Sequence, residues 1–311
     1  MTNHRHAYLI MAHTEWQVLN TLLQLLDDAR NDIFLHIDRK VKVWPDLYRP
    51  RFSRLILTPR RHDVRWGDVG QIHTEMMLFR TAHAQGPYQY YHLLSGVDLP
   101  IKNQDEIHDF FDRHQGEEFV GFACPDDFNK ADIERKCQRY YFLMRWNYRC
   151  TFEPAWKLTL AKAIRFVTLK LQDWMHMSRG HELTFRNGYN WASLTEEAVS
   201  YLLSREDFIR HRFAHTSCAD EIYKHSLLIS HPTFSRKLHD VTDANRGSMR
   251  YIDFLRNNSG GNRGEPYNWQ DEDSGELLAS PYLFARKFSS RHSKVIGDIV
   301  KAIRKPNMQD V

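Results

Sequence analysis

Cysteine is scarce in this chain, with four residues among 311. Cys124, Cys137, Cys150 and Cys218 are widely spaced, and the sequence contains neither a CxxC pair nor a Cys/His cluster at the spacing of zinc ligands. The pattern therefore excludes a disulfide framework and a zinc ribbon. We expect free thiols in a reducing compartment.

Long apolar runs and an excess of one charge are also missing. The N-terminal sequence MTNHRHAYLIMAH contains an apolar run that is too short for a signal peptide core or a membrane span. We therefore expect a cytoplasmic protein, with peripheral contact to the inner face of a membrane as an open alternative. The net charge is only +4, from 43 basic and 39 acidic residues. This balance argues against nucleic acid as a partner, which normally requires a concentrated basic face.

Several common catalytic signatures are absent from the sequence. It contains no GxxxxGKS/T phosphate loop, no GxGxxG dinucleotide turn, no HExxH zinc helix and no GxSxG nucleophile elbow. If the ligand is a nucleotide, other groups must bind its phosphates.

Apolar strands that end in polar residues are what the sequence does contain. The segment YYHLLSGVDLPI, residues 90–101, runs from an apolar strand into a Ser-Gly turn, Asp98 and a proline. Upstream, the apolar residues 33–37 are followed directly by Asp38. Because open parallel sheets bind ligands at the carboxyl ends of their strands, the two aspartates point to one shared site. For either aspartate alone, a turn-capping role is an equal alternative.

Strands and helices alternate through residues 1–125, the expected nucleotide-binding part. Strands are predicted at residues 7–12, 33–37, 54–57, around 92 and at 119–123, with amphipathic helices between them. This alternation predicts an α/β fold with a doubly wound, mostly parallel sheet flanked by helices.

The rest of the chain is expected to complete a single domain. Residues 126–180 are predicted to be a basic helical insertion, residues 181–290 an acceptor and catalytic part, and residues 291–311 a C-terminal tail. Within the insertion, residues 156–177 place four basic side chains among Leu, Ile, Phe and Trp. Such a helix can lie on anionic lipid, and a core-packed helix with solvated lysines is the alternative.

Eight motifs follow one another over residues 7–288. They are AYLIMAH, FLHIDRK, VRWGDVGQIHTEMMLF, YYHLLSGVDLPIKN, GYNWASLTEEAVSYLL, CADEIYKHSLL, RYIDF and YLFARKF. In this order and spacing they resemble the core-2/I-branching glycosyltransferases, which include branch-forming N-acetylglucosaminyltransferases and peptide O-xylosyltransferases. The resemblance implies a GT-A-type fold, a UDP-sugar donor, inversion at the anomeric carbon, and transfer without a metal or other cofactor.

The resemblance assigns the catalytic base to Glu221. An acceptor hydroxyl must lose its proton as it attacks the anomeric carbon, and a helix N-terminus favours the carboxylate form that a base needs. Ser217 and Asp220 predict a capping box, with Glu221 in the first turn of a helix that runs to Ile229. Without the resemblance, Glu221 would be interpreted only as a favourable first-turn residue.

The resemblance also assigns the donor site. Arg286 and Lys287 match a basic pair that contacts the diphosphate, where a guanidinium and an ammonium offset the charge on the leaving oxygen. Asn190 stands where xylosyltransferases have aspartate, and an amide lacks the paired acceptor oxygens of a carboxylate. The other donor positions are Met11, Asp38, Val64, Arg65, Trp66 and Trp191, and the expected acceptor-side residues are Asp98 and Arg135.

The sequence therefore predicts a metal-independent inverting transferase. It would move GlcNAc, or alternatively xylose, from a UDP-sugar to a hydroxyl of a glycan or lipid-linked glycan in surface polysaccharide synthesis. A metal-dependent transferase using Asp271 and Asp273 is a rival, although this acidic triplet stands in a polar loop rather than at a strand end. A non-catalytic glycan-binding protein is a second rival, and Glu221, Arg286 and Lys287 argue against it.

Overall fold

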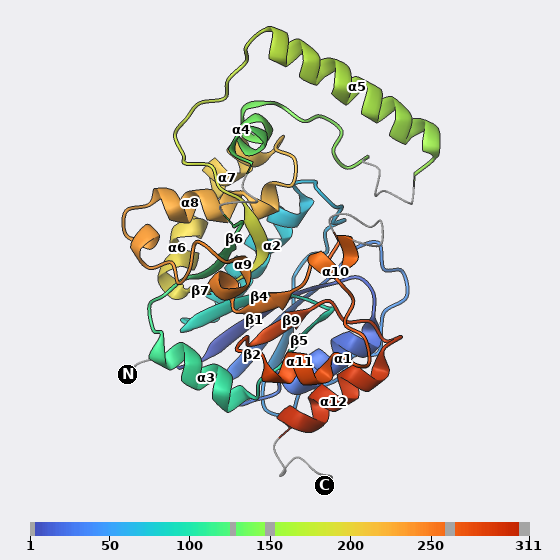
Figure 1. The fold of residues 1–311 in the computed structure, drawn as a ribbon, viewed down its shortest axis with the longest axis vertical. Helices are drawn as coiled ribbons and strands as arrows, with labels where there is room; N and C mark the ends of the chain where they lie inside the picture. The colour runs from blue at the N-terminus through green and yellow to red at the C-terminus, as the bar shows by residue number, and fades with distance from the viewer. Residues whose placement is uncertain (1–3, 125–128, 147–152, 259–264, 305–311) are drawn as a thin grey trace.

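The fold is built around a six-stranded sheet. The computed structural model describes residues 4–124, 129–146, 153–258 and 265–304 (Figure 1). The strand order is β3 (Arg54–Leu57), β2 (Asn31–Ile37), β1 (His6–Ala12), β4 (Tyr90–Ser95), β7 (Gly188–Thr195) and β6 (Phe119–Phe122). The first four strands are parallel, and only β7 runs antiparallel to its neighbours β4 and β6. The predicted α/β class with a mostly parallel sheet is confirmed.

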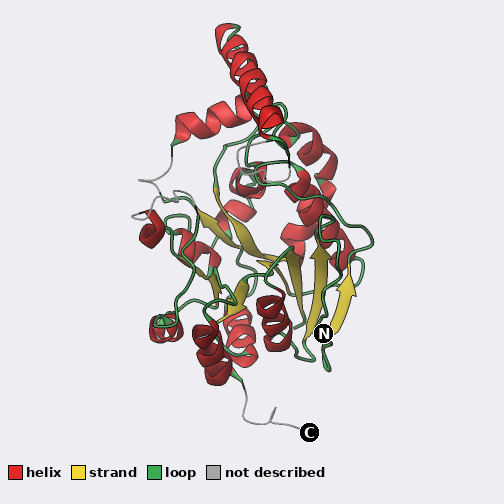
Figure 2. Ribbon diagram, turned by 90° about the vertical axis from the view of Figure 1, so that its right-hand side faces the viewer, coloured by secondary structure: helices red, strands yellow, loops and turns green. Residues whose placement is uncertain are grey.

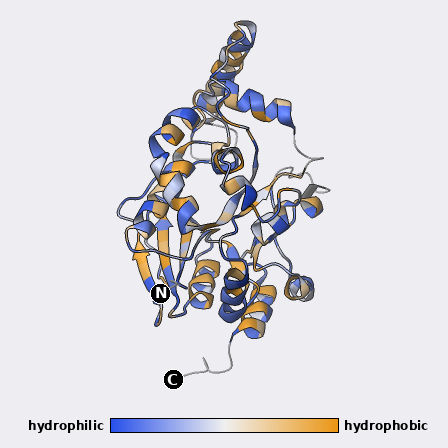
Figure 3. Cartoon of the chain, turned by 90° about the vertical axis from the view of Figure 1, so that its left-hand side faces the viewer, coloured by the Kyte–Doolittle hydropathy of each residue, from blue (hydrophilic) through white to orange (hydrophobic). Residues whose placement is uncertain are grey.

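Helices cover both faces of this sheet (Figure 2). One face packs against α2 (Gly70–His83), α6 (Glu196–Ser204), α7 (Glu206–Phe213) and α8 (Tyr223–Ser230). The other face packs against α1 (Trp16–Leu25), α3 (Gln104–Arg113) and α12 (Ser293–Ile303). Because successive side chains of a strand point to opposite faces, Leu9 enters the first core and its neighbours Tyr8 and Ile10 enter the second. Burial on both faces explains why these strands are mostly apolar, as the orange colouring of much of the sheet in Figure 3 shows.

A second, three-stranded sheet carries C-terminal residues to the carboxyl end of β4. Its order is β5 (Asp98–Pro100), β9 (Phe284–Arg286) and β8 (Arg250–Ile252). The fully buried Arg250 ties it to the main sheet, because Nη2 donates to Ala192 O at 2.7 Å and Nη1 donates to Ser248 O at 2.5 Å. Burial lowers the pKa of Arg250 to about 9, against the opposing effect of Asp98.

The C-terminal region is more ordered than the sequence predicts. Beyond Arg246 the sequence pattern is loop-like, but α9 (Ala244–Ser248) extends into this stretch and two more short helices follow, α10 (Leu255–Asn258) and α11 (Ser274–Ala279). Residues 291–311 are predicted to be a tail, but α12 buries Val295 and Ile299 in the second core. Helices of four to six residues are too short to show the hydrophobic periodicity by which helices are recognised in a sequence.

The helical insertion contains α4 (Lys130–Gln138) and α5 (Ala155–Trp174), and α5 projects from the body (Figures 1 and 2). Among the helices that the structure describes, none is both long and apolar enough to cross a membrane. Cys124, Cys137 and Cys218 are free thiols, as predicted, and Cys150 lies outside the described residues.

Candidate active site

The carboxyl ends of β1, β2 and β4 meet at one edge of the sheet. Met11 pairs with Ser95 of β4, and Gly96 N donates to Met11 O at 2.9 Å. Asp38 N donates to Ala12 O at 2.9 Å, which joins the end of β2 to the end of β1. A Cβ on Gly96 would lie 2.8 Å from the Ala12 Cβ, so only glycine allows the turn after β4 to approach β1 this closely. The two predicted ligand-binding strand ends, those of β2 and β4, therefore lie on either side of the end of β1.

Asp38 holds the segment that carries Val64. Its Oδ2 accepts from Val64 N at 3.0 Å and from Lys40 Nζ at 2.7 Å, and its Oδ1 accepts from Lys40 N at 2.8 Å. The carboxylate is 4% exposed. Asp38 thus ties the end of β2 to the segment that carries Val64, and its hydrogen bond from Lys40 N shows that it also caps the turn after β2.

Arg65 belongs to an ion-pair network next to Val64. Asp63 accepts from Arg65 Nη2 at 3.2 Å, from Lys40 Nζ at 3.0 Å and from Arg145 Nη2 at 3.0 Å. Burial alone would raise the pKa of Asp63, but hydrogen bonds from Arg65 and Lys40 outweigh it and hold the pKa at about 2. Asp63 is therefore ionised at neutral pH and orients the Arg65 guanidinium.

Trp66 and Glu221 are brought near each other by one backbone hydrogen bond. Gly67 has φ 73°, and its carbonyl accepts from Cys218 N at 3.2 Å. The predicted capping box at Ser217 is wrong, because Cys218 adopts a left-handed conformation with φ 51° and no side chain caps the following turn. Glu221 ends a short 3₁₀ helix, Ala219–Glu221, and α8 begins at Tyr223. The candidate base therefore lies half-buried on a tight turn beside the Trp66 segment.

Two ionisable side chains interact electrostatically with Glu221. Burial raises the pKa of Asp220 well above its ordinary value, and repulsion from Glu221 and Glu75 adds to this effect. On α4, burial alone lowers the pKa of Lys136, but its ion pair with Asp132 at 2.7 Å and the charge of Glu221 outweigh it, so the pKa is raised. From the sequence, Asp220 is expected only as part of a capping box, and no pattern indicates Lys136.

Asn190 joins the Glu221 turn to the central sheet. Its Oδ1 accepts from Lys224 Nζ at 2.5 Å, and the same ammonium donates to Glu75 Oε2 at 2.8 Å and to Asp220 O at 3.0 Å. Lys224 and Glu75 are completely buried. The Asn190 Nδ2 is buried and has no acceptor among the residues that the structure describes.

Trp191 and Arg286 meet on the opposite face of β7. The Arg286 Cζ lies 4.7 Å from the centroid of the Trp191 ring, a cation–π distance. Arg286 Nη1 donates to Asp98 Oδ1 at 2.7 Å, while Asp98 Oδ2 accepts from Ser95 N at 2.8 Å. Asp98 is 2% exposed, and burial raises its pKa against the effect of Arg286. These contacts favour a positioning role for Asp98 over the acceptor-side role that the sequence predicts.

His13 ends the motif AYLIMAH, but the resemblance assigns it no site role. It directly follows β1, and although it is exposed, partial loss of hydration lowers the pKa of its imidazole. Asp38 opposes this shift, whereas Lys40, Arg286 and Lys287 add to it. Asp38 and Lys40 after β2, and Arg286 and Lys287 at the end of β9, thus all act on one imidazole. This imidazole is uncharged at neutral pH.

Three of the residues considered from the sequence lie apart from this group. Arg135 Nη2 donates to Asp173 Oδ2 at 2.7 Å and so joins α4 to α5. Asp271 Oδ1 accepts from Lys294 N at 3.0 Å at the start of α12, and Asp273 forms an ion pair with Arg256 at 3.2 Å. The acidic triplet thus supports the C-terminal region and does not lie at a strand end of the main sheet.

A sequence profile of the Core-2/I-branching enzymes matches residues 6–274, which is most of the chain. The chain belongs to the Core-2/I-branching enzyme family. It is a UDP-sugar-dependent glycosyltransferase, which acts on a sugar donor and a glycan acceptor. Among solved structures, mouse xyloside xylosyltransferase 1 in its apo form is similar at 12% identity and a TM-score of 0.28, over 70% of this chain and 79% of that one. No curated protein sequence matches this glycosyltransferase.

Proposed function

We propose that this enzyme transfers GlcNAc from UDP-GlcNAc to a hydroxyl of a surface glycan, with inversion and without a divalent metal ion. Xylose is the alternative sugar. The observation that carries the proposal is the preorganised Arg286, which is bound by Asp98 and faces Trp191, and whose charge acts on His13 together with those of Lys287 and Lys40. Cations that are already fixed in place stabilise developing negative charge without reorganising during the reaction.

The leaving diphosphate would bind between these cations. Arg286 keeps donors besides the Nη1 that binds Asp98, and a guanidinium suits the paired oxygens of a phosphate. His13 is uncharged there and can donate a hydrogen bond to a phosphate oxygen. Together these groups supply the stabilisation that a metal ion provides in metal-dependent transferases.

The acceptor proton would pass to Glu221. As the acceptor oxygen attacks the anomeric carbon, the C–O bond to the diphosphate breaks on the opposite face, UDP leaves with the bonding electrons, and Glu221 takes the hydroxyl proton. Lys136 favours the charged form of Glu221 through its own positive charge. Burial and the repulsion from Glu221 raise the pKa of Asp220, which disfavours its charged form and makes it a weaker candidate for the base.

The amide of Asn190 supports GlcNAc over xylose. Its Nδ2 has no acceptor among the described residues and is closed to solvent in the unliganded structure, and the carbonyl oxygen of an N-acetyl group would be a suitable acceptor if donor binding opens this position. Xylose offers only hydroxyls at the corresponding carbons. Satisfying a buried donor of this kind contributes about 1 to 3 kcal/mol, which is sufficient for a clear sugar preference.

A panel of nucleotide sugars tests the donor assignment. We expect UDP-GlcNAc to raise the melting temperature more than UDP-xylose does, and GDP-mannose, the control for the nucleoside, to have no effect. A larger shift with UDP-xylose would reverse the sugar assignment. The absence of a shift with every UDP-sugar would contradict the proposed site.

We also propose that α5 places the enzyme on an anionic membrane surface at the cytoplasmic face, where a lipid-linked acceptor would be available. Only Ala161 and Gln172 of this helix are buried, so the core-packed alternative is wrong. An apolar stripe is exposed at helical spacing and has a tryptophan near each end: Trp156, Leu160, Ile164, Val167, Leu171 and Trp174. Exposed tryptophan and aliphatic residues on one helix face are typical of interfacial helices.

The charges of α5 decide between a membrane and a second copy of the chain. Its four basic residues are Lys157, Lys162, Arg165 and Lys170. Its only acidic residue, Asp173, already binds Arg135 and Arg139 at 2.7 and 2.8 Å. Two copies would bring like charges together, whereas anionic lipid is complementary to them. A cavity of about 230 Å³ lies against the same helix, lined by Leu143, Trp146, Trp156, Lys157, Leu160, Ala161 and Ile164, with room for part of an acyl chain.

Vesicle sedimentation tests this surface. We expect the enzyme to bind vesicles that contain phosphatidylglycerol and to bind pure phosphatidylcholine vesicles much less. The double variant Trp156→Glu/Trp174→Glu should lose this binding, whereas Val43→Glu, at another exposed apolar residue, should retain it. Equal binding by wild type and double variant, or dimerisation that Trp156→Glu/Trp174→Glu abolishes, would overturn the membrane assignment.

A further inference from the structure

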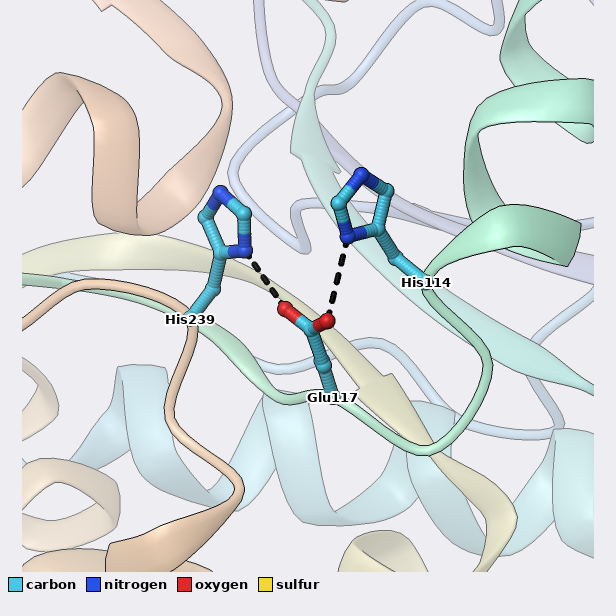
Figure 4. Close-up of side chains that lie close together, drawn as sticks. All are labelled: His114, Glu117 and His239. Atoms are coloured by element: carbon cyan, nitrogen blue, oxygen red, sulfur yellow. Dashed lines mark hydrogen bonds and ion pairs between the residues drawn. The ribbon is translucent and has the colours of Figure 1, made fainter.

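A cluster of two histidines and a glutamate lies at the edge of the sheet opposite the active site. His114 Nδ1 and His239 Nδ1 lie 3.1 and 2.6 Å from the two carboxylate oxygens of Glu117 (Figure 4). The three ligand atoms that these side chains offer all lie within 4.8 Å of one another. Within the described part of the chain, this is the only group of three or more His, Cys, Asp or Glu residues that meets that spacing.

The backbone around the cluster holds its members in place. The buried Tyr90 hydroxyl donates to both His114 O, at 2.7 Å, and Glu117 O, at 3.1 Å, so one side chain secures both ends of the turn after α3. His239 comes from a distant segment, and its N donates to Glu118 O at 3.1 Å beside a β-bridge between Glu118 and Leu238. The cluster is therefore built on fixed backbone rather than on a free loop.

Aromatic packing restricts the two imidazoles. The His114 ring lies 4.5 Å from Phe110, and the His239 ring lies 4.7 Å from Phe119, measured between ring centroids. The two imidazole planes are 89° apart with centroids 5.3 Å from each other. Both rings direct Nδ1 toward the space that Glu117 faces (Figure 4). Ring orientations fixed in this way lower the entropy that a metal ion would have to remove on binding.

We propose that His114, Glu117 and His239 form a structural site for a divalent transition metal, with Zn²⁺ as the best match. Two imidazole nitrogens and one carboxylate are an established zinc ligand set, and water can complete a tetrahedron. Zinc bonds of about 2.0 to 2.1 Å place tetrahedral ligand atoms about 3.3 Å apart, so the partly exposed side chains need only a small closure. Mg²⁺ and Ca²⁺ prefer oxygen ligands and suit two imidazoles poorly.

This metal would join two segments and take no part in transfer. Glu117 precedes β6, which runs parallel to β4, so the cluster lies at the amino ends of these strands, whereas the UDP site lies at the carboxyl ends. The bound ion would link the turn after α3 to the segment that leads into α9 and the second sheet. The site is independent of the proposed donor and acceptor.

Metal titration of chelator-treated, tag-free enzyme tests the proposal. We expect about one equivalent of Zn²⁺ to bind by calorimetry, and Co²⁺ at the same site to give the visible bands of a four-coordinate ion. His239→Gln and Glu117→Gln should each weaken Zn²⁺ binding at least about tenfold and abolish the rise in melting temperature that Zn²⁺ gives the wild type. His83→Gln is the matched control, because His83 Nδ1 lies 2.7 Å from a single carboxylate, that of Glu196.

Two results would overturn the site. One is wild-type enzyme that binds no stoichiometric Zn²⁺, and the other is unchanged Zn²⁺ affinity in both variants. Two variants are used so that the test still gives an answer if one of them fails to fold. UDP-sugar turnover in the chelator-treated enzyme separates this proposal from the transferase proposal, since loss of zinc should lower the melting temperature and leave turnover of the folded enzyme intact.

Discussion

Arg286 and Asp98 are direct register partners across the antiparallel pair of β9 and β5, and their side chains form an ion pair at 2.7 Å. The partners are 188 positions apart in the chain. Asp98 also accepts from Ser95 N, so one carboxylate fixes both the turn after β4 and Arg286, the arginine proposed to bind the diphosphate. The two aspartates that mark the strand ends therefore position cations, Asp98 holding Arg286 and Asp38 holding Lys40.

Asp98→Asn should lower the affinity for UDP, because Asp98 orients Arg286. The amide keeps the shape of the carboxylate but removes the charge that orients the guanidinium, so UDP affinity should fall by about tenfold, in line with one charge-assisted hydrogen bond. Calorimetry with UDP on folded protein measures this effect. If Asp98 instead contacted the acceptor, UDP affinity would stay at the wild-type value and only the acceptor KM would rise.

Lys287→Ala should weaken UDP binding directly. A charge-assisted contact contributes roughly 1.5 to 3 kcal/mol, which corresponds to a loss of about one to two decades in affinity. Lys301→Ala is the control. Lys301 is exposed in the last turn of α12, so this substitution removes the same charge from a helix surface outside the proposed site. Equal UDP affinity in the two variants would remove Lys287 from the diphosphate site.

Turnover of the UDP-sugar, or its slow hydrolysis, should persist in excess EDTA. The expectation rests on the cations Lys40, Arg286 and Lys287 around His13, and on the structural contacts of Asp271 and Asp273. Rates in EDTA and in Mn²⁺ are compared after the zinc content has been measured. Activity that returns only on adding Mn²⁺ would favour the metal-dependent alternative.

Much of this site follows from local sequence patterns, because strand ends and turns are local features. Apolar runs that end in polar residues predict the strands that carry Asp38 and Asp98, and both strands pair with β1. The motifs name Trp191 and Arg286, and the structure brings these two side chains into contact. The helix expected from Ser217 fails, because Cys218 adopts a left-handed conformation and bonds to Gly67, a contact that no local pattern encodes.

Residues that meet only through the tertiary fold were invisible to the same reasoning. His13, Lys136 and the pair formed by His114 and His239 carry no spacing signal, and Glu117 and His239 are 122 positions apart. The exposure of the apolar stripe of α5 could not be predicted from the sequence either. The periodicity of the sequence indicates an amphipathic helix, but whether its apolar side packs on the core depends on how the tertiary fold orients the helical insertion.

The protonated Glu118 should contribute to the free energy of unfolding, and this contribution should fall as pH rises. Burial raises the pKa of this carboxyl from 4.5 to about 7, while hydrogen bonds from Thr195 oppose the shift. The folded state thus holds a proton that the unfolded state releases between about pH 4.5 and 7. The contribution is complete below this window, is lost as pH rises through 7, and amounts to about 3 kcal/mol.

Glu118→Gln isolates this component, because the amide imitates the protonated acid. Above pH 7 the variant should be more stable than the wild type, and the difference should shrink toward pH 5. Urea unfolding of both proteins across this range measures it, and subtracting the two curves removes the opposite contribution of the buried histidines. A difference that does not vary with pH would show that Glu118 is ionised in the folded protein throughout.

Glu221→Gln distinguishes a catalytic role of Glu221 as the base from a purely structural role. A base acts only as the acceptor proton leaves, so this nearly isosteric variant should bind UDP-sugar almost normally and lose on the order of 10² to 10⁴ in turnover. If Glu221 only supports the turn before α8, the change should cost about 1 kcal/mol of stability or less and leave turnover per folded molecule nearly intact. Glu272→Gln, at an exposed acid of the polar loop, is the control for the loss of charge.

Measuring UDP affinity, melting temperature and turnover on one preparation distinguishes these cases. Near-wild-type turnover in Glu221→Gln would require another carboxylate, and the structure argues against both Asp220 and Asp98. Burial raises the pKa of Asp220, which disfavours its charged form, and the Asp98 carboxylate is already held in the ion pair with Arg286. Lys136→Met provides the final check, because removing the cation near Glu221 should raise the pKa of the base and shift the acidic limb of the turnover profile to higher pH.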